Sequence, residues 1–283
     1  MSIHTRVSGA RRRLRDAGLS LSEADLSARL LAEHVLGWTR ERLLTDGWSS
    51  EPAGFATHFD ALVARRAARE PLPYIVGHRE FWELDFEVTP AVLIPRPETE
   101  LIVEAALALV PPNRSATIAD VCTGCGCVAV AIARERPNAH VIATDVSEEA
   151  LEIARRNADR LGVSSRVEIR HGDLLEPIDT TCDLIVANPP YVVAGAGPAL
   201  TPEVRDHEPD VALFGGEDGL RLVERLVRDA PARIRSGGAL IFEFGYGQDE
   251  EIEQMIARSA DLTIIDIKRD LQGIARTAVA RRR

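Results

Sequence analysis

Apolar residues recur every three or four positions through the first 70 residues of the chain, a spacing that is typical of amphipathic helices. The pattern is clearest over residues 22–36 and returns over 55–69. Ser20 or Ser22 is suited to cap the first of these helices. No strand pattern precedes about Tyr74, so we predict a small helical domain over residues 1–70.

The pattern changes between residues 71 and 96. Two runs, 71–77 and 80–88, are rich in aromatic and β-branched residues, which alternate with charged ones. Such alternation is expected of a β-hairpin. We interpret residues 71–96 as a β-hairpin connector between two domains.

From residue 97 to the end, strand patterns alternate with helix patterns. This order implies an α/β fold in which a parallel sheet is covered by helices on both faces. Such sheets bind ligands beyond the carboxyl ends of their strands. The predicted strands are 117–121, 140–145, 166–170, 183–187, 239–244, 262–267 and 275–280, and the predicted helices are 98–110, one after 126, 147–161, 219–234 and 248–258. Residues 97–283 are therefore predicted to form the main domain.

The composition agrees with a globular chain and argues against a membrane protein. At 283 residues, 45% hydrophobic and 28% charged, the chain has room for a large domain with a small companion. No apolar run approaches the roughly 18–20 residues of a membrane span. The basic N-terminus lacks the apolar segment of a secretory signal. We expect a cytoplasmic protein, and a monomer.

The formal net charge of −10 is unevenly distributed. Residues 1–75 carry 11 basic and 9 acidic residues, and the remainder carries 23 and 35. An acidic main domain repels phosphate backbones, so direct binding to nucleic acid is not expected. The basic run 11–15 leaves room for a local positive patch, but a solvated helix face is the preferred interpretation.

Three of the four cysteines lie close together at Cys122, Cys125 and Cys127, and this spacing raises the possibility of a metal site. The fourth, Cys182, starts a predicted strand, whereas Cys122 ends another. If those strands are parallel, the two cysteines lie at opposite ends of them. We therefore interpret the cluster as small residues in a tight loop and predict no metal.

Three successive strand ends carry residues suited to a nucleoside cofactor. The first is followed by a glycine loop that opens a helix, where free N–H groups and close backbone approach are available. Asp145 ends the second strand about 20 residues later and is placed to hold a ribose diol. Asp173 follows the third strand, where a loop would close over the base. This arrangement would also suit a nicotinamide cofactor. The loop consists of Cys122, Thr123, Gly124, Cys125 and Gly126.

The fourth strand decides between these cofactors. It ends in Asn188-Pro189-Pro190-Tyr191, a stiff segment that is rich in hydrogen-bond acceptors because proline lacks an N–H group. This segment resembles the Asn/Asp-Pro-Pro-aromatic motif of amino methyltransferases that use S-adenosyl-L-methionine. The resemblance implies a Rossmann-like seven-stranded methyltransferase sheet.

Motifs outside the cofactor loops narrow the resemblance to one family. They are 71–77, 80–82, 93–100, Glu203-Val204, Glu208-Pro209, 215–219 and 273–276. Together they resemble the peptide chain release factor glutamine methyltransferases over nearly the whole chain, most weakly in the first 70 residues. Related ribosomal-protein glutamine methyltransferases share Asn-Pro-Pro-Tyr but differ at Arg-Pro-Glu-Thr-Glu, and nucleic-acid amino methyltransferases share only the core motifs.

The resemblance implies transfer of a methyl group from S-adenosyl-L-methionine to the side-chain amide nitrogen (N5) of the glutamine in the Gly-Gly-Gln motif of class 1 release factors, leaving S-adenosyl-L-homocysteine. It implies that the helical domain and the hairpin provide the docking surface for the protein substrate and that Tyr191 or Pro190 walls the substrate amide. The implied catalytic residues are Asn188, Pro189, Pro190 and Tyr191; the implied cofactor-binding residues are Cys122, Thr123, Gly124, Cys125, Gly126, Asp145, Asp173, Leu174 and Asn188.

Three positions depart from the family pattern. Cys122 stands where the family usually has glycine, Cys125 replaces the usual serine or threonine, and Leu174 stands where some members have tryptophan on the adenine. We expect these changes to affect cofactor affinity more than activity, although a left-handed backbone at Cys122 would be strained. Two alternatives stay open: an amino methyltransferase for ribosomal protein or nucleic acid, and a binding module without turnover.

Overall fold

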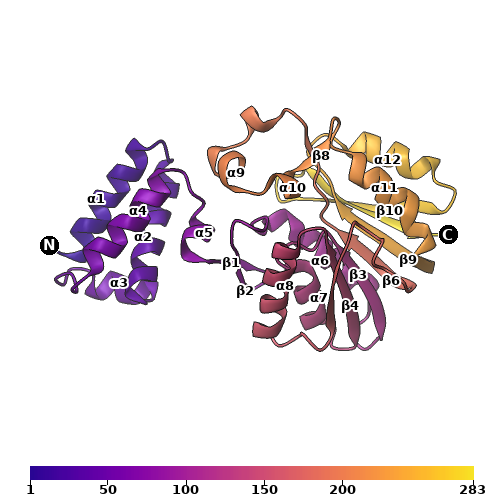
Figure 1. Cartoon of the computed structure of the whole chain (residues 1–283), viewed down its shortest axis with the longest axis horizontal. Helices are drawn as coiled ribbons and strands as arrows, with labels where there is room; N and C mark the ends of the chain where they lie inside the picture. The colour runs from indigo at the N-terminus through magenta and orange to yellow at the C-terminus, as the bar shows by residue number, and fades with distance from the viewer. The chain divides into compact units, whose positions relative to one another are not determined.

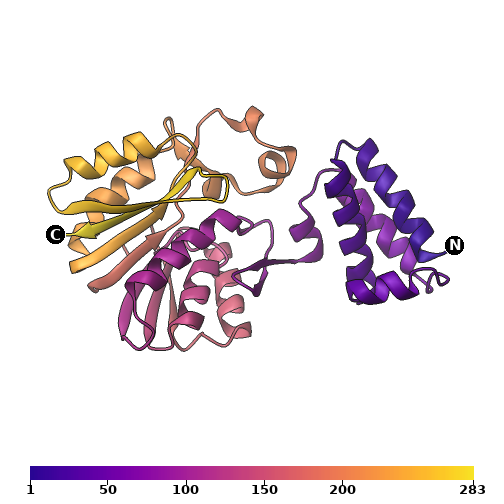
Figure 2. The ribbon, with the colours of Figure 1, turned by 180° about the vertical axis from the view of Figure 1, so that it is seen from behind.

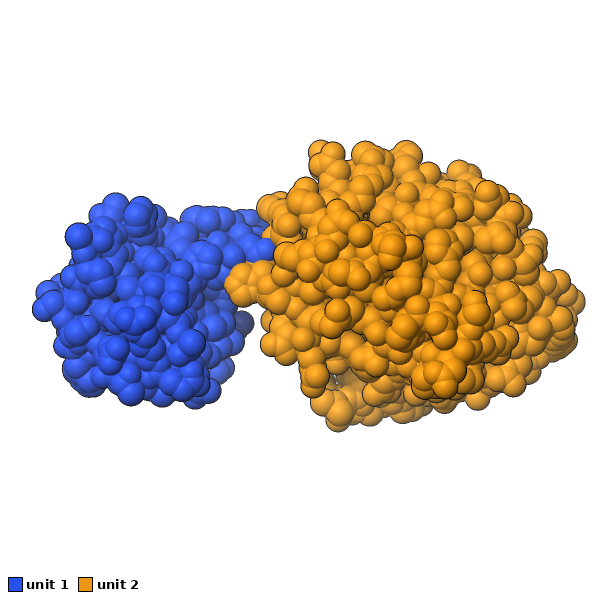
Figure 3. Space-filling model, turned by 90° about the horizontal axis from the view of Figure 1, so that it is seen from below, with its two compact units in different colours: residues 1–77, 201–207 blue, residues 78–200, 208–283 orange.

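The computed structural model describes all residues from Met1 to Arg283. The chain divides into two compact units (Figure 3). Unit 1 consists of Met1–Gly77 with Thr201–His207, and unit 2 consists of His78–Leu200 with Glu208–Arg283.

Unit 1 is helical, as the apolar spacing predicts. Its helices are α1 Ile3–Asp16, α2 Leu21–Leu36, α3 Arg40–Asp46, α4 Phe55–Ala67, the short α5 Leu72–Val76 and α9 Pro202–His207. Ser20 caps α2 in a capping box with Glu23, so the first of the two predicted caps is the right one. The core packs around fully buried residues of α1, α2 and α4, including Leu14, Leu31 and Phe59.

The predicted hairpin is present but shorter than the pattern suggested. Strands β1 His78–Phe81 and β2 Leu84–Glu87 pair antiparallel, and the turn residues Trp82 and Glu83 both have positive φ, as in a tight two-residue hairpin turn. The run 71–77 forms α5 instead of a strand. Proline in the first turn of a helix costs no hydrogen bond, which is why its proline-rich start did not prevent this helix.

The centre of unit 2 is a seven-stranded sheet in the order β10-β11-β9-β6-β3-β4-β5 (Figures 1 and 2). The strands are β3 Ala116–Val121, β4 Ala139–Asp145, β5 Val167–His171, β6 Cys182–Ala187, β9 Ile234–Glu243, β10 Leu262–Arg269 and β11 Ala275–Arg282. The expectation of a fully parallel sheet is wrong for β11, which runs antiparallel to both neighbours. The link between β10 and β11 is too short for a helical crossover, so the two strands form a hairpin.

Helices cover both faces of this sheet (Figures 1 and 2). On one face α6 Glu100–Leu109 contacts α7 Cys127–Glu135, which contacts α8 Glu148–Arg160. On the other face α11 Arg221–Asp229 and α12 Asp249–Arg258 share one buried apolar cluster with side chains of β3, β6, β9 and β11, and α12 contacts β10 and β11. The helix predicted over 219–234 ends early because Pro231 cannot continue it, and one 3-10 turn, Ala230–Ala232, leads into β9.

Short elements fill the remaining part of unit 2. A 3-10 turn, Pro97–Thr99, precedes α6, and another, Gly197–Ala199, follows the small strand β7 Val192–Val193. This strand pairs with β8 Phe214–Gly216, which follows the one-turn helix α10 Asp210–Leu213. None of the helices of the chain has the length and hydropathy needed to cross a bilayer.

Candidate active site

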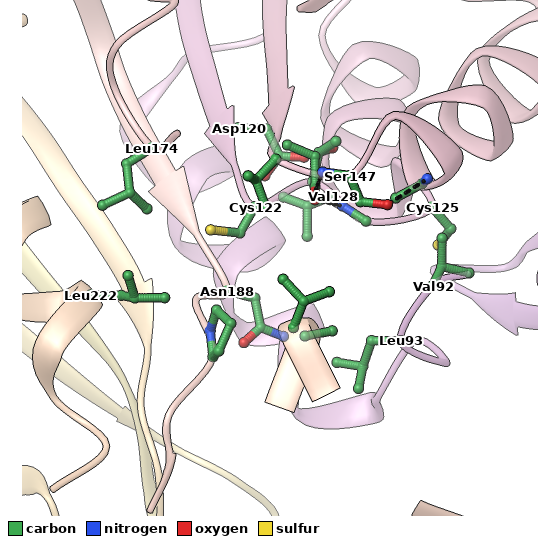
Figure 4. A pocket seen from close by; sticks show the side chains of 18 of the residues that line it. Val92, Leu93, Asp120, Cys122, Cys125, Val128, Ser147, Leu174, Asn188 and Leu222 are labelled. Carbon is green, nitrogen blue, oxygen red and sulfur yellow. Dashed lines mark hydrogen bonds between the residues drawn. The ribbon is translucent and has the colours of Figure 1, made fainter. Parts of the chain in front are cut away.

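A cavity of about 370 Å³ lies at the carboxyl ends of β3, β4 and β6, where the fold class predicts ligand binding (Figure 4). Most of the predicted site residues line it: Cys122, Thr123, Gly124, Cys125, Asp145, Asp173, Leu174, Asn188 and Pro190. Gly126, Pro189 and Tyr191 are not among the lining residues. Four separate loops therefore meet around one space.

The buried carboxylate of Asp120 connects the glycine loop to the start of α7 through hydrogen bonds. Asp120 accepts hydrogen bonds from the Thr123 hydroxyl at 2.6 Å and from the Ala129 N–H at 3.0 Å. Burial raises its pKa to about 7, and the charge of Asp145 adds to that rise. Asp120 lies in β3, two residues before the loop, and was not among the predicted site residues.

Several residues of this loop adopt left-handed backbone conformations. Cys122 has φ +59°, Gly124 +56° and Gly126 +81°. The conformation expected to strain Cys122 is therefore the one it adopts. At Gly126 a Cβ atom would lie 3.1 Å from the Ala154 Cβ, so glycine also permits the close packing of α7 on α8.

Asp145 is oriented by two backbone donors at the end of β4. Its Oδ2 accepts from the Gly124 N–H and its Oδ1 from the Ser147 N–H, each at 2.9 Å. Burial raises its pKa above the ordinary aspartate value, and these N–H groups oppose the rise. Each oxygen keeps a lone pair for a further donor, such as a ligand hydroxyl.

The third loop carries an ion pair in addition to the predicted residues. Asp173 accepts from the guanidinium of Arg225 of α11 at 2.8 Å, and both residues line the cavity. Leu174 has φ +50°, and its carbonyl accepts from the Thr144 hydroxyl at 3.0 Å. Arg225 had no signal in the sequence because it comes from a helix 52 residues further along the chain.

The fourth loop places Asn188 in a chain of side-chain hydrogen bonds that reaches the protein interior. Its Nδ2 donates to the Thr99 Oγ1 at 3.1 Å, and the Thr99 hydroxyl donates to Glu243 at 2.7 Å. The Tyr191 hydroxyl donates to the other oxygen of Glu243 at 2.9 Å. Burial raises the pKa of Glu243, and burial together with Glu243 raises the pKa of Tyr191.

Two glycines and one glutamine lie close to the backbone of the Asn-Pro-Pro-Tyr segment. A Cβ at Gly215 would lie 2.4 Å from the Pro190 carbonyl oxygen, and one at Gly219 would lie 2.2 Å from that of Tyr191. Gln248 donates to the Tyr191 carbonyl at 3.3 Å. The motif 215–219, quoted above only for its resemblance, is thus explained by close backbone packing.

The Arg-Pro-Glu-Thr-Glu and Glu-Pro motifs also meet at the cavity. Arg96, which lines it, pairs with Glu208 at 2.6 Å, and the Glu208 side chain is only 1% exposed. Thr99 of the same motif also lines the cavity and holds Asn188. No local pattern in these motifs indicated roles for Arg96, Thr99 or Glu208. A glutamate at position 243, inside the otherwise apolar predicted strand 239–244, was the one local signal for the buried partner of Thr99.

Models of known families match both parts of the chain. The PrmC N-terminal domain matches residues 7–77, and the methyltransferase small domain matches residues 99–203. A solved methyltransferase from Pyrococcus furiosus, 21% identical, superposes with a TM-score of 0.53 over 70% of this chain and 88% of its own. At that identity it shows the fold alone.

Curated relatives match over almost their full length. The release factor glutamine methyltransferase of Cereibacter sphaeroides is 43% identical over 265 residues, covering 94% of each chain. That of Mycolicibacterium smegmatis is 40% identical and covers 99% of this chain and 98% of its own. Identity of this extent, together with the fold and the loops described above, shows that the chain belongs to the release factor glutamine methyltransferases.

Proposed function

We propose that the chain transfers a methyl group from S-adenosyl-L-methionine to the N5 amide nitrogen of the glutamine in the Gly-Gly-Gln motif of class 1 peptide chain release factors. The observation that carries the proposal is Asn188 on the cavity wall, with its amide nitrogen engaged by Thr99 and its Oδ1 left as an acceptor. Membership of the family supports the choice of substrate.

The residues of the cavity fit the cofactor. Asp145 offers lone pairs to a ribose diol, Asp173 and Leu174 flank the place for the base, and the loop 122–126 offers backbone at the start of α7. The space of about 370 Å³ is that of a small-molecule site. When bound, the cofactor supplies a methyl group on a positively charged sulfur that is already activated for transfer.

The chain's own residues supply position and polarity to the acceptor amide. An amide nitrogen is a weak nucleophile because its lone pair is delocalised into the carbonyl. Asn188 Oδ1 and the Pro189 carbonyl would accept its two hydrogens, which favours a pyramidal nitrogen and stabilises the positive charge that develops on it. The methylated nitrogen carries one proton too many and is strongly acidic, so it loses that proton to solvent without a strong general base; none of the seven histidines lines the cavity.

Selectivity for glutamine follows from reach. An asparagine side chain is one methylene shorter, so its amide would fall short of the methyl group when its backbone is docked. The lost contact alone is worth about 1–3 kcal/mol, and misalignment adds to it. The helical segment 1–70 is proposed to dock the release factor, with 71–96 as connector and 97–283 as the catalytic domain.

The test is methyl transfer from labelled cofactor to a release factor, beside the same factor carrying Gly-Gly-Asn. We expect label only in the Gly-Gly-Gln protein, and mass spectrometry should locate it on that glutamine. Asn188→Ala should abolish turnover and leave cofactor affinity within a few-fold, which separates an enzyme from a cofactor-binding module. Absence of label despite cofactor binding would overturn the proposal and favour a ribosomal-protein or nucleic-acid substrate.

A further inference from the structure

Two buried residues, Thr99 at the cavity wall and Glu243 behind it, connect Asn188 to the protein interior. Thr99 lies at the start of α6 and Glu243 at the end of β9, 144 residues apart in sequence. Both are buried, with exposed fractions of 2% and 1%. Neither has a place among the residues assigned above to cofactor or substrate.

The direction of the hydrogen bonds in this chain is fixed by the chemistry of its members. A carboxylate can only accept, so ionised Glu243 takes the single hydroxyl hydrogen of Thr99. The Thr99 oxygen is then left with lone pairs only, and its neighbour must be a donor. Asn188 therefore has to turn its Nδ2 toward Thr99. Its Oδ1 is in consequence directed away from Thr99.

Tyr191 completes the arrangement from the other end of the same motif. Its hydroxyl donates to Glu243 Oε1, while Thr99 donates to Oε2. Both carboxylate oxygens are thus occupied by donors, which is how a buried charge is stabilised. Burial is the largest influence on the pKa of Glu243 and raises it, whereas the hydrogen bonds from Thr99 and Tyr191 lower it and favour the ionised form that accepts from both.

We propose that Thr99 and Glu243 are positioning residues that set the orientation of the Asn188 amide through this directed relay. With the relay intact, Oδ1 is the acceptor for the substrate N–H. If the relay is reversed, Asn188 would present an NH₂ group to the substrate NH₂ group and repel it. The inference rests on the proposed function, because it assumes an acceptor that carries N–H hydrogens.

The relay predicts that Glu243→Gln lowers kcat in the wild-type protein and raises it in the Asn188→Asp variant. In Glu243→Gln the new amide accepts from Tyr191 and donates to Thr99, so Thr99 donates to Asn188 and flips it. We expect kcat to fall about 100-fold, the size of a misplaced catalytic contact. Asn188→Asp alone should also be poor, because the introduced carboxylate and Glu243 would compete for one hydroxyl hydrogen. Adding Glu243→Gln to Asn188→Asp supplies that hydrogen and should raise kcat at least about tenfold.

A merely structural role for Glu243 predicts a different result, namely that Glu243→Gln lowers kcat in both backgrounds. That outcome would overturn the relay. Thr99→Val, which matches the shape of threonine without its hydroxyl, should lower kcat with little change in cofactor affinity. Thr99→Ser keeps the hydroxyl and should restore most of the rate. Equal loss in both Thr99 variants would also contradict the proposal.

A readout that needs no turnover separates this inference from the proposed function. Neutron diffraction of deuterated crystals distinguishes ND₂ from oxygen in the Asn188 side chain. We expect ND₂ to face Thr99 in the wild-type protein and oxygen to face it in Glu243→Gln. Oxygen facing Thr99 in the wild type, or no change in the variant, would overturn the relay. If the wild type leaves release factor unlabelled, the proposed function fails and the neutron result still decides the relay.

Discussion

At the scale of single residues, Asp120 makes the stability of the protein depend on pH. Burial raises its pKa to about 7 in the folded chain, whereas an unfolded aspartate titrates near 3.9. Between those values the folded state binds the proton more tightly. The free energy of unfolding therefore falls as pH rises through this window, and the loss is complete above about pH 7.

The variant Asp120→Asn removes this titration and keeps an oxygen that can accept from Thr123 and Ala129. We expect the unfolding free energy of the wild type, relative to the variant, to fall by about 2–4 kcal/mol between pH 4 and pH 7. Urea unfolding of both proteins at several pH values measures the difference. Curves that stay parallel across the window would show that Asp120 does not titrate there.

At the scale of elements, the contact of β8 with the fourth loop positions the catalytic motif. A methyl group on residue 215 would meet two backbone oxygens, those of Pro190 at 2.4 Å and Gly219 at 2.5 Å. Backbone atoms cannot swing aside as side chains can, so Gly215→Ala should push the loop that carries Asn188. A displacement of about 1 Å costs roughly 100-fold in rate, and we expect kcat to fall by that order.

Gly197→Ala is the matched control, because a Cβ there has no atom within 4 Å and it lies in the same segment between the motif and β8. Steady-state kinetics of both variants and equilibrium binding of the cofactor make the comparison. The control should keep wild-type kcat, and both variants should keep cofactor affinity within a few-fold. An unchanged kcat in Gly215→Ala would mean that β8 does not position Asn188.

The sequence predicts the helices and strands and the residues around the cavity with different accuracy. Most of the helices and central strands that had predicted bounds lie within a few residues of them, because their apolar periods report burial directly. The exceptions are β9, which begins five residues before its predicted start, and α11, which ends five residues before its predicted end. β11 was assigned the wrong direction, since alternation of elements says nothing about a final hairpin. Residues at the ends of strands were found because the fold brings those ends together.

The partners of those residues could not be predicted from local patterns. Thr99 reaches Glu243 across 144 residues, and Arg225 reaches Asp173 across 52. A pairing between side chains so far apart is decided by the packing of whole elements. The sequence contained only indirect signals of these pairings. One was an acidic residue, Glu243, within the predicted apolar strand 239–244, and another was the motif 96–100, whose residues had no predicted role.

At the scale of the whole molecule, the two units have separate hydrophobic cores. The core of unit 1 is built from α1, α2 and α4, and the core of unit 2 includes the face of the sheet under α11 and α12. All residues assigned to the cofactor belong to unit 2. Loss of packing in one core should therefore leave the other core and its ligand site intact.

Leu31→Ala tests this separation, because Leu31 is fully buried in unit 1. The truncation leaves a cavity and should destabilise that unit by about 2–5 kcal/mol. Hydrogen exchange followed by mass spectrometry should show faster exchange in α1, α2 and α4, and unchanged exchange in β3 and β4. Cofactor affinity should stay at the wild-type value, while transfer to the release factor falls if unit 1 docks it.

The matched variant Ile185→Ala, equally buried in β6, should show the opposite distribution, with faster exchange in the sheet and weaker cofactor binding. Faster exchange in both units for either variant would mean that the chain unfolds as one cooperative body.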